Sequence, residues 1–586
     1  MRLGIDFGST YSTISRYDPV RDTVEAVTMQ EGDPASIPSV VSINKRGMVT
    51  CGQGAKMQAG KKNIRLFEAF KMLLTEQNET LLQERGYDSQ YTPRAITAKF
   101  LEHIISGALK RSGGGDTVEN LVICVPEIWS RGVTARDGRY ILRDLLYHEI
   151  GPKVEHVRVV TEPEAASAYF AYNYEKETGK TFNGHLLLID YGGGTLDITL
   201  TEVASDGKGG MEIAYREGGG DGENHRDAAG ASDIGCAGIA YMQNVVLLAL
   251  RDQEYIAPDE TPNYASPAFV GAVHELEIQL RVPERIEQIE DTFGVYGSFR
   301  KMDEILEEEP TEFVPLDYDG EELIVTFHHL FRAYQQVIEP VVRKEISKIN
   351  ASVQQHIGAD PTKAEAGVRD DFKIALVGGF GSFYLVKAQI SEIYNLDYNS
   401  AIDLRTKSIN ASQRELAISL GAALVSAKKI ELRKTARHSI GLATVYPNKK
   451  IKKIYYGIKY HQNVETDTFY YLLTDPNEED KGYNRATWAA MSGNIEYLMI
   501  EWSDAVNCGT PLTLKAEMLE RLKRIPEGGL WQCAFSMDDS DVFSIHVVPV
   551  TTTSAPDKSR KVVDITLESF ARMFEMTEAK RICTDQ

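Results

Sequence analysis

A short stretch near the N-terminus combines an aspartate with a glycine and small hydroxyl residues. In "DFGSTYS", Asp6 ends an apolar segment and is followed by Gly8, Ser9, Thr10 and Tyr11. The glycine and the hydroxyl residues predict a tight turn between two strands. Backbone N–H groups and hydroxyls in such a turn can bind phosphate oxygens, and the carboxylate can hold a hydrated magnesium ion. An ordinary hairpin with an Asp cap is the alternative for this stretch alone.

A second stretch repeats this plan in the middle of the chain. Residues 185–201 read "HLLLIDYGGGTLDITLT", in which Asp190 ends a buried-type strand and Asp197 lies in the next one. The turn between the strands consists of Gly192, Gly193, Gly194 and Thr195. Two such hairpins could bind a polyphosphate from both sides, with Asp6 and Asp190 sharing the hydration shell of one metal ion.

A third glycine turn lies at 373–385, "KIALVGGFGSFYL". A buried strand runs into Gly378 and Gly379, and a helical stretch begins at about Tyr384. A glycine pair between a strand and a helix allows a ligand to approach the backbone closely.

The elements that carry these turns predict an α/β protein. The first two turns join strand pairs, and the third joins a strand to a helix. Because the hairpin plan occurs twice at a spacing too long for a solenoid, we expect two similar lobes, each contributing one hairpin and one aspartate.

The composition is that of a soluble globular protein with more than one domain. The chain has 586 residues, 42% of them hydrophobic and 25% charged, and its net charge is −21. Single cores stop growing at about 250–300 residues. The negative charge argues against a nucleic-acid surface, and no stretch approaches the roughly 18 apolar residues of a membrane span. The six scattered cysteines form no C-x-x-C pair, which predicts neither a zinc site nor a disulfide framework and favours a reduced cytoplasm.

The three turns resemble known motifs. "GIDFGSTYS", "LLLIDYGGGTLDIT" and "IALVGGF" are similar to the phosphate-1, phosphate-2 and adenosine motifs of the actin/hexokinase/heat-shock ATPase superfamily. Further segments are similar to those of the seventy-kilodalton heat-shock (DnaK-type) chaperones. They are "LVICVPEIWS" at 121–130, "VVTEPEAASAYF" at 159–170, "TFHHLFRAYQQVIEPVVRKEI" at 326–346 and "SLGAALVSA" at 419–427. The resemblance covers about residues 1–430.

This resemblance implies a two-lobed actin-like ATPase with duplicated ribonuclease-H-like lobes. Lobe I would comprise about 1–183 plus a final helix at 411–430, and lobe II about 184–410. ATP or ADP with Mg²⁺ would lie between them. Asp6 and Asp190 would then face the metal through water, and Asp197 and Thr195 would lie near the attacking water. The phosphates would be held by Gly8, Ser9, Thr10, Tyr11, Gly192, Gly193, Gly194 and Thr195.

Two further residues are assigned by the resemblance. Glu162 in "EPEAA" matches a glutamate that supports the metal and the water, the alternative being a carboxylate at a helix start. Lys71 in "LFEAFKMLL" matches a lysine that reaches the transferring phosphate, the alternative being a solvated lysine on an amphipathic helix.

The part of the site that binds adenosine is expected near the third turn. Gly378 and Gly379 would lie under the adenosine, where Phe380 replaces the small residue common in the family. Glu415 lies where an acidic residue precedes the final helix, the alternative being a surface glutamate. Glu275 and Gln279, at a helical i, i+4 spacing, are expected to contact the adenine.

Beyond Lys429 the pattern changes to short alternating stretches separated by turn signals. Residues 431–586 therefore predict an all-β domain of the sandwich type, with two packed sheets. In DnaK-type chaperones a β-sandwich at this position binds extended apolar peptides. The basic stretch "KKIELRKTARHS" replaces the usual acidic linker, and no long helical lid follows.

Three functions are compatible with these features. The first is a cytoplasmic ATPase chaperone with unfolded or extended polypeptides and J-domain or exchange-factor cochaperones as partners. The second is an actin-like assembly protein whose β-domain is an attachment module. The third is a small-molecule kinase, for which Glu127 in "VPEIWS" is the candidate carboxylate base.

Overall fold

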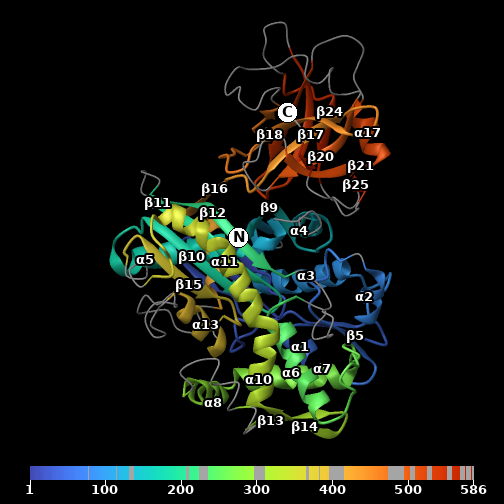
Figure 1. Cartoon of the computed structure of the whole chain (residues 1–586), viewed down its shortest axis with the longest axis vertical. Helices are drawn as coiled ribbons and strands as arrows, with labels where there is room; N and C mark the ends of the chain where they lie inside the picture. The colour runs from blue at the N-terminus through green and yellow to red at the C-terminus, as the bar shows by residue number, and fades with distance from the viewer. Residues whose placement is uncertain are drawn as a thin grey trace. The chain divides into compact units, whose positions relative to one another are not determined.

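The computed structural model describes the chain except for residues 77, 114, 116, 131–136, 206–209, 223–234, 296–305, 307–310, 364–368, 382, 395–414, 467, 473–493, 502–507, 524–530, 551–556, 568–573, 576–581 and 584–586. The fold is mixed α/β, as predicted (Figure 1). The chain forms two compact units. Unit 1 comprises Met1–Ile128 and Asp144–Leu432, and unit 2 comprises Trp129–Arg143 and Arg433–Gln586.

The first large sheet of unit 1 places the N-terminal turn. Strands β1 (Arg2–Asp6), β2 (Tyr11–Asp18), β3 (Thr23–Ala26), β8 (Thr117–Val125) and β9 (Lys153–Thr161) lie in the order β3-β2-β1-β8-β9. β1 pairs antiparallel with β2 and parallel with β8. Asp6 therefore lies at the carboxyl end of β1, and the expected hairpin turn spans the gap to Tyr11.

The second sheet of unit 1 repeats this arrangement. Strands β10 (Gly184–Tyr191), β11 (Leu196–Ser205), β12 (Met211–Asp221), β15 (Phe372–Val377) and β16 (Ile430–Arg433) lie in the order β15-β10-β11-β12-β16. β10 and β11 are antiparallel, with Asp190 opposite Asp197, and β10 is parallel to β15. The ends of β10 and β15 thus bring the second hairpin next to Gly378. The basic stretch that we expected to be a linker forms β16.

Helix α5 (Glu162–Thr178) follows β9 directly and fixes the position of Glu162. Thr161 precedes the helix and donates its backbone N–H to Glu164 Oε2 at 3.1 Å, which is half of a capping box. Gly179, with a φ of 66°, ends the helix in the left-handed conformation that glycine favours. Local sequence therefore determines where this helix begins and ends.

Helix α15 (Ala417–Ser426) packs against α5 and β1. The close approach of α15 to β1 and to α5 requires a glycine at each contact. A Cβ on Gly4 would lie 2.2 Å from the Ala423 nitrogen, and one on Gly421 would lie 1.8 Å from the Ala165 oxygen. The final helix expected at 411–430 is shorter in the structure, since α15 ends at Ser426 and β16 begins at Ile430, and residues 411–414 lie outside the described residues. Its close packing joins the first sheet to α5.

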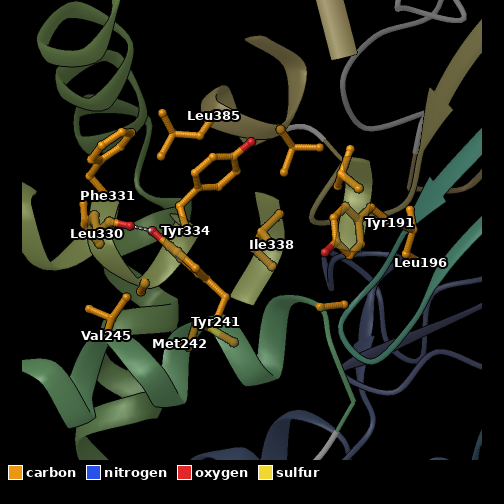
Figure 2. Close-up of a cluster of buried hydrophobic side chains, with 14 of the residues drawn as sticks. Tyr191, Leu196, Tyr241, Met242, Val245, Leu330, Phe331, Tyr334, Ile338 and Leu385 are labelled. Atoms are coloured by element: carbon orange, nitrogen blue, oxygen red, sulfur yellow. Dashed lines mark hydrogen bonds between the residues drawn. The ribbon is translucent and has the colours of Figure 1, made fainter. Parts of the chain in front are cut away.

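The second half of unit 1 has a large apolar core behind the second sheet. Figure 2 shows Tyr241 of α6 (Gly238–Asp252), Tyr334 of the π-helix η2 (Tyr334–Ile338) and Leu385 of α13 (Tyr384–Tyr394) in one cluster. All three side chains are fully buried, and the Tyr241 hydroxyl donates to the Leu330 carbonyl at 3.2 Å. Burying a large apolar side chain contributes about 1.5–3 kcal/mol. This core holds the helices that line the site.

The other elements of unit 1 are β4 (Ile37–Pro38), β5 (Val41–Asn44), β6 (Val49–Cys51), α1 (Gln53–Lys56), β7 (Ile64–Phe67), α2 (Glu79–Glu84), α3 (Pro93–Arg111), α7 (Pro267–Arg281), α8 (Pro283–Gly294), β13 (Glu312–Tyr318), β14 (Glu321–Thr326), α10 (Phe327–Ala333) and α11 (Glu339–Ile357). The 3-10 helix η1 (Glu127–Ser130) and helix α4 (Asp137–His148) each contain a boundary between the units.

Unit 2 contains two sheets. The first has the order β18-β17-β20-β21-β25 with β26 also on β21, and the second has the order β19-β22-β23-β24. The strands are β17 (Ser439–Val445), β18 (Ile451–Ile458), β19 (Tyr470–Tyr471), β20 (Ile495–Glu501), β21 (Cys508–Leu514), β22 (Trp531–Met537), β23 (Phe543–Pro549), β24 (Val563–Thr566), β25 (Phe574–Glu575) and β26 (Ile582–Cys583). One apolar cluster takes residues from both sheets. Helix α17 (Ala516–Lys523) corrects the expectation that this part has strands alone.

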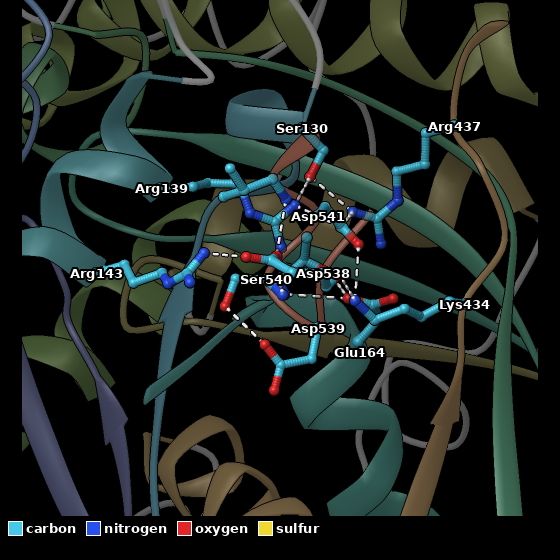
Figure 3. Close-up of polar contacts among 12 residues, drawn as sticks. Ser130, Arg139, Arg143, Glu164, Lys434, Arg437, Asp538, Asp539, Ser540 and Asp541 are labelled. Carbon is cyan, nitrogen blue, oxygen red and sulfur yellow. Dashed lines mark hydrogen bonds and ion pairs between the residues drawn. The ribbon is translucent and has the colours of Figure 1, made fainter. Parts of the chain in front are cut away.

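A polar cluster joins the segment Trp129–Arg143 to the turn between β22 and β23 and to Arg437, all within unit 2 (Figure 3). Arg139 donates to Ser130 Oγ at 2.8 Å and pairs with Asp541 at 2.8 Å, and Arg437 donates to the same Ser130 Oγ at 2.6 Å. Arg143 pairs with Asp538. Residues some 400 positions apart are thereby held together by buried charges, which no local sequence pattern predicts.

One expectation about the cysteines is wrong. Cys508 is disulfide-bonded, and the backbone of β21 pairs Cys508 with Cys583 of β26. Cys51, Cys124, Cys236 and Cys533 are free thiols. Isolated cysteines far apart in sequence carry no spacing signal, so the pairing of two strands could not be read from them. Among the described helices, none is long and apolar enough to cross a membrane.

Candidate functional site

A cavity of about 640 Å³ lies in unit 1 where the three glycine turns meet. Its walls include most of the residues that we expected to bind a nucleotide. They are Asp6, Gly8, Ser9, Thr10, Tyr11, Lys71, Glu162, Asp190, Gly192, Gly193, Gly194, Thr195, Gly378, Gly379, Phe380 and Glu415. Segments separated by up to four hundred residues thus converge on one cavity.

The two hairpins face each other closely. A Cβ on Gly193 would lie 1.9 Å from Thr10 Oγ1, and one on Gly194 would lie 2.7 Å from Ser9 Oγ. Gly192 N–H donates to the Thr195 carbonyl at 3.1 Å and closes the second turn. Side chains at these glycines would collide with the Ser9 and Thr10 hydroxyls, so only glycine allows the two hairpins to approach this closely.

The third turn packs directly beneath Asp190. Gly378 has a φ of +84°, and a Cβ there would lie 2.4 Å from Asp190 Oδ1. The backbone N–H groups of Phe380 and Gly381 both donate to the Tyr191 carbonyl, at 3.0 and 2.9 Å. The position therefore requires glycine for two reasons, a left-handed backbone and the lack of space.

Two buried carboxylates lie beside the turn between β10 and β11. Asp190 and Asp197 are buried, and the Oδ2 atom of each lacks a hydrogen-bond partner among the described residues. Buried acceptor oxygens of this kind are costly unless a ligand satisfies them. Oxygen ligands from one or two carboxylates are what Mg²⁺ uses when it keeps most of its waters. Among the described residues, no three His, Cys, Asp or Glu side chains are close enough to hold a metal directly.

Burial and mutual repulsion raise the pKa values of these acids. Desolvation and then the charge of Glu162 raise the pKa of Asp6 to about 8, although Lys71 opposes both. Desolvation followed by Glu162 also raises the pKa of Asp190 and of Asp197 well above the usual range. A cation in the cavity would favour the charged carboxylates, because opposite charges lower carboxyl pKa values.

Lys71 and Glu162 form a buried pair beside the aspartates. Lys71 Nζ lies 2.5 Å from Glu162 Oε1, and the two residues are 2% and 6% exposed. Lys71 lies in a turn after β7, so it is neither solvated nor on a helix. The ammonium is thus held at the cavity wall, where it can meet an anionic ligand.

Asp197 lies behind the cavity wall and is held by the backbone of η1. Ile128 N–H donates to Asp197 Oδ1 at 3.1 Å. The neighbouring Glu127 is fully buried and contributes to the raised pKa of Asp197, after desolvation and Glu162. Glu127 therefore belongs to the acidic group at this end of the site, although it does not line the cavity.

The far end of the cavity is apolar and aromatic. Phe380 and Phe383 stack with ring centroids 5.2 Å apart, and Ile286, Ile289 and Tyr384 lie nearby in the cavity wall. The Arg281 guanidinium lies 3.8 Å from the Tyr11 ring centroid. A planar ring with an attached polar chain fits these surroundings, since aromatic and guanidinium faces stack on such rings.

Helix α7 presents a different face to the cavity than we predicted. Glu275 accepts the Asp317 backbone N–H at 2.9 Å, and neither Glu275 nor Gln279 lines the cavity. Glu277 and Arg281 line it instead, with the same i, i+4 spacing. Glu275 and Gln279 do lie on one helix, but not on the face that lines the cavity. Glu415 does line the cavity and accepts the Ser36 hydroxyl at 2.7 Å.

Comparison with known proteins supports the motif resemblance. Residues 2–218 match the model of the family described as Hsp70 protein. The chain is 25% identical over 432 residues to the protein named "Chaperone protein DnaK" of Thermotoga petrophila, covering 72% of this chain and 59% of that protein. It is 30% identical over 238 residues to "Chaperone protein dnaK" of Emiliania huxleyi, covering 37% of this chain and 34% of that protein.

A similar match is found in an archaeon. The chain is 30% identical over 207 residues to "Chaperone protein DnaK" of Nitrosopumilus maritimus, covering 34% of this chain and 29% of that protein. The chain thus spans about three fifths of the length of the Thermotoga relative and about a third of the other two. The resemblance seen in the motifs is confirmed for the N-terminal part.

Proposed function

We propose that this protein, which is related to the Hsp70 proteins, binds ATP with Mg²⁺, hydrolyses it, and uses the nucleotide state to regulate polypeptide binding by unit 2. The observation that carries the proposal is the pair of glycine hairpins facing each other across one cavity, with Asp6 and Asp190 at their strand ends and Lys71–Glu162 beside them. This arrangement supports an actin-like ATPase with two lobes, about 1–183 plus the helix before 430 and about 184–410.

Phosphate binding follows from the hairpins. Ser9, Thr10 and Tyr11 bind phosphate oxygens from one side, and the turn Gly192–Thr195 binds them from the other. Backbone N–H groups that the turns already hold in position need no reorganisation when the anion binds. Asp6 and Asp190 hold Mg²⁺ through water. When bound, the ion neutralises phosphate charge and fixes the orientation of the phosphates.

Hydrolysis is assigned to the residues around Lys71. Its ammonium contacts the terminal phosphate, where a compact charge stabilises the transition state. Glu162 holds the ammonium at 2.5 Å and, with Thr195, orients the attacking water. Asp197 can accept the proton of that water once a cation in the cavity lowers its raised pKa and restores the carboxylate charge.

The base end of the cavity binds adenosine. Gly378 and Gly379 let the ligand approach the backbone, and the ring stacks against the Phe380–Phe383 pair or the Arg281 guanidinium. Glu277 Oε1 is buried and has no hydrogen-bond partner among the described residues, so it can accept a hydroxyl hydrogen of the ribose. Glu277 and Arg281 thus take the role expected of Glu275 and Gln279.

The chaperone part of the proposal concerns unit 2. It rests on the relatives named DnaK and on two sheets with a common apolar core, the layout expected of a β-sandwich. The proposed partners are extended polypeptides, together with J-domain and exchange-factor cochaperones. The division into domains 1–430 and 431–586 and a cytoplasmic location stay predictions.

The test is ATP binding and turnover by the full chain, with and without extended apolar peptides. Asp190→Asn and Gly193→Asp should abolish turnover and weaken ATP binding, while Asp259→Asn, a change at an exposed loop carboxylate, should leave both unchanged. Folding of each variant is checked by circular dichroism. Wild-type ATP affinity and turnover in both folded site variants would contradict the proposal. Turnover that is indifferent to peptide, with ATP-dependent sedimentation, would favour the assembly function.

A further inference from the structure

One face of helix α7 holds the second half of unit 1 to the first. His274, Glu277 and Arg281 are spaced i, i+3 and i+7, so they project from the same side of the helix. Each contacts a residue of the N-terminal part. His274 pairs with Glu68, Glu277 pairs with Lys56 at 2.8 Å, and Arg281 lies over the Tyr11 ring. We call this set of contacts the α7 clasp.

The α7 clasp borders both the nucleotide cavity and a second cavity. The second cavity, of about 290 Å³, is lined from the N-terminal part by Lys56 and Glu68 and from the helices by His274 and Glu277. It shares Ser9, Thr10, Met242 and Glu277 with the nucleotide cavity. Any movement that separates α7 from the N-terminal part must therefore break the clasp.

The Lys56–Glu277 pair and His274 are shielded from solvent, whereas the side chains of Glu68 and Arg281 are 34% and 40% exposed. The exposed fractions are 9% for Lys56, 7% for His274 and 8% for Glu277. Removing one charge from such a buried pair leaves its partner uncompensated, which is far more costly than breaking a surface ion pair. Of the two ion pairs in the clasp, only Glu68–His274 contains a group with an ordinary pKa near neutrality.

The charges around the pair favour its ionised form. Burial alone would raise the pKa of Glu68, but His274 lowers it overall, helped by Lys56 and Arg85. Burial alone would lower the pKa of His274, but Glu68 and then Glu277 raise it overall, against Lys56. Tyr87 also faces Glu68, and its pKa is raised by burial and by that carboxylate.

We propose that the Glu68–His274 pair makes the α7 clasp sensitive to pH and thereby sets how fast a bound nucleotide leaves the cavity. The proposal deepens the proposed function and rests on it for the identity of the ligand. Nucleotide release requires the two sides of the cavity to separate, and the ionised pair opposes that separation. Loss of the proton from His274 removes the pair.

The sign of the effect follows from linkage. In the separated state His274 is hydrated and titrates near its ordinary value of about 6.5, whereas in the clasped state its pKa is raised. The clasp is therefore fully stabilised below about pH 6.5 and loses this stabilisation as the pH rises through the raised value. Release should be slow in mild acid and fast in mild alkali.

The first experiment follows release of a fluorescent ADP analogue from the full chain by stopped flow between pH 6 and pH 9. We expect release to accelerate about tenfold over this range, equivalent to ~1.4 kcal/mol. His274→Asn and Glu68→Gln should release the nucleotide at the fast rate at every pH. The double variant should behave like each single one, because the same interaction is lost. His356→Asn on α11 is the matched control and should keep the wild-type profile.

A second measurement does not depend on nucleotide. Met57 and Ile278 adjoin Lys56 and Glu277 and are 68% and 55% exposed, so both accept spin labels carried by an encoded ketone amino acid. In the protein without nucleotide, the distance between the labels should lengthen as the pH rises, and His274→Asn should show the long distance throughout. A pH-independent distance, or a wild-type pH profile in His274→Asn, would overturn the clasp. Failure to bind the ADP analogue while the distances still respond to pH would overturn the proposed function alone.

Discussion

The crowded carboxylates predict that the protein without ligand loses stability as the pH rises, and that Asp6→Asn removes part of this loss. In the folded protein the pKa of Asp6 is raised to about 8, against 3.8 for the ordinary group. A group with a raised pKa stabilises the folded state fully below the unfolded value, and this contribution is lost as the pH rises through the folded value. The loss therefore falls between about pH 4 and pH 8.

The size of this stability loss follows from the titration of one proton. Between pH 5 and pH 8 folded Asp6 keeps a proton that the unfolded chain has released, at about 1.4 kcal/mol per pH unit, which amounts to ~4 kcal/mol over three units. Asp6 is partly exposed, so we expect about half of this, ~2 kcal/mol. Asp6→Asn has a similar shape and no charge, so it should flatten the profile and exceed the wild type in stability at pH 8.

The assay separates the two units. Urea unfolding in EDTA is followed at pH 5, 6, 7 and 8 by circular dichroism at 222 nm, which reports mainly on the helices of unit 1. The four tryptophans, at 129, 488, 502 and 531, all lie in unit 2, so their fluorescence is the internal control. The reasoning is refuted if Asp6→Asn is less stable than the wild type at pH 8, or if both have the same pH dependence.

Three further predictions concern single contacts. Lys71→Met leaves Glu162 without its buried partner, so the unfolding free energy at pH 7 should fall by about 3 kcal/mol. ATP turnover should be at least a hundredfold slower, and intact turnover would contradict the role of the lysine. Gly378→Ala forces a Cβ to 2.4 Å from Asp190 Oδ1 at a φ of +84°, so ATP affinity measured by calorimetry should fall more than tenfold. Asp541→Asn should lower the unfolding free energy seen by tryptophan fluorescence by about 3 kcal/mol, and with it the urea midpoint, while the 222 nm transition stays unchanged. Coincident shifts of both signals would refute a contact confined to unit 2.

The parts of the site that could be predicted are those encoded locally. Within about ten residues, an apolar run determines a strand, an Asp marks its end, and Gly with small hydroxyl residues forms the turn. Both hairpins, with their two aspartates, can therefore be predicted from the sequence. Glu162 could also be located, because Thr161, Pro163 and Glu164 mark the start of its helix. In each case the functional side chain lies at the end of an element whose boundary has its own sequence signal.

The parts that could not be predicted depend on contacts distant in sequence. The expected helical spacing of Glu275 and Gln279 agrees with α7, but a shift of two residues turns a side chain by about 200° around the helix. The i, i+4 spacing fits Glu275 and Gln279 as well as Glu277 and Arg281. What orients the helix is the contact of the second pair with Lys56 and Tyr11, which are more than two hundred residues away in the sequence. The grouping of Trp129–Arg143 with unit 2 depends likewise on Asp538 and Asp541.

Several buried polar atoms that have no hydrogen-bond partner in the described part of the chain lie around the nucleotide cavity. Thr10 Oγ1, Asp190 Oδ2 and Asp197 Oδ2 are buried without hydrogen-bond partners among the described residues, and Gly378 holds a left-handed backbone beside them. Local signals and packing agree at other places in unit 1, such as the capped start of α5 and the tyrosine-rich core of Figure 2. A sequence under selection for stability alone would pair these atoms or replace them with apolar groups. A cation that restores the carboxylate charges, together with an anion that accepts the hairpin donors, would satisfy all of them at once, and a magnesium polyphosphate combines the two.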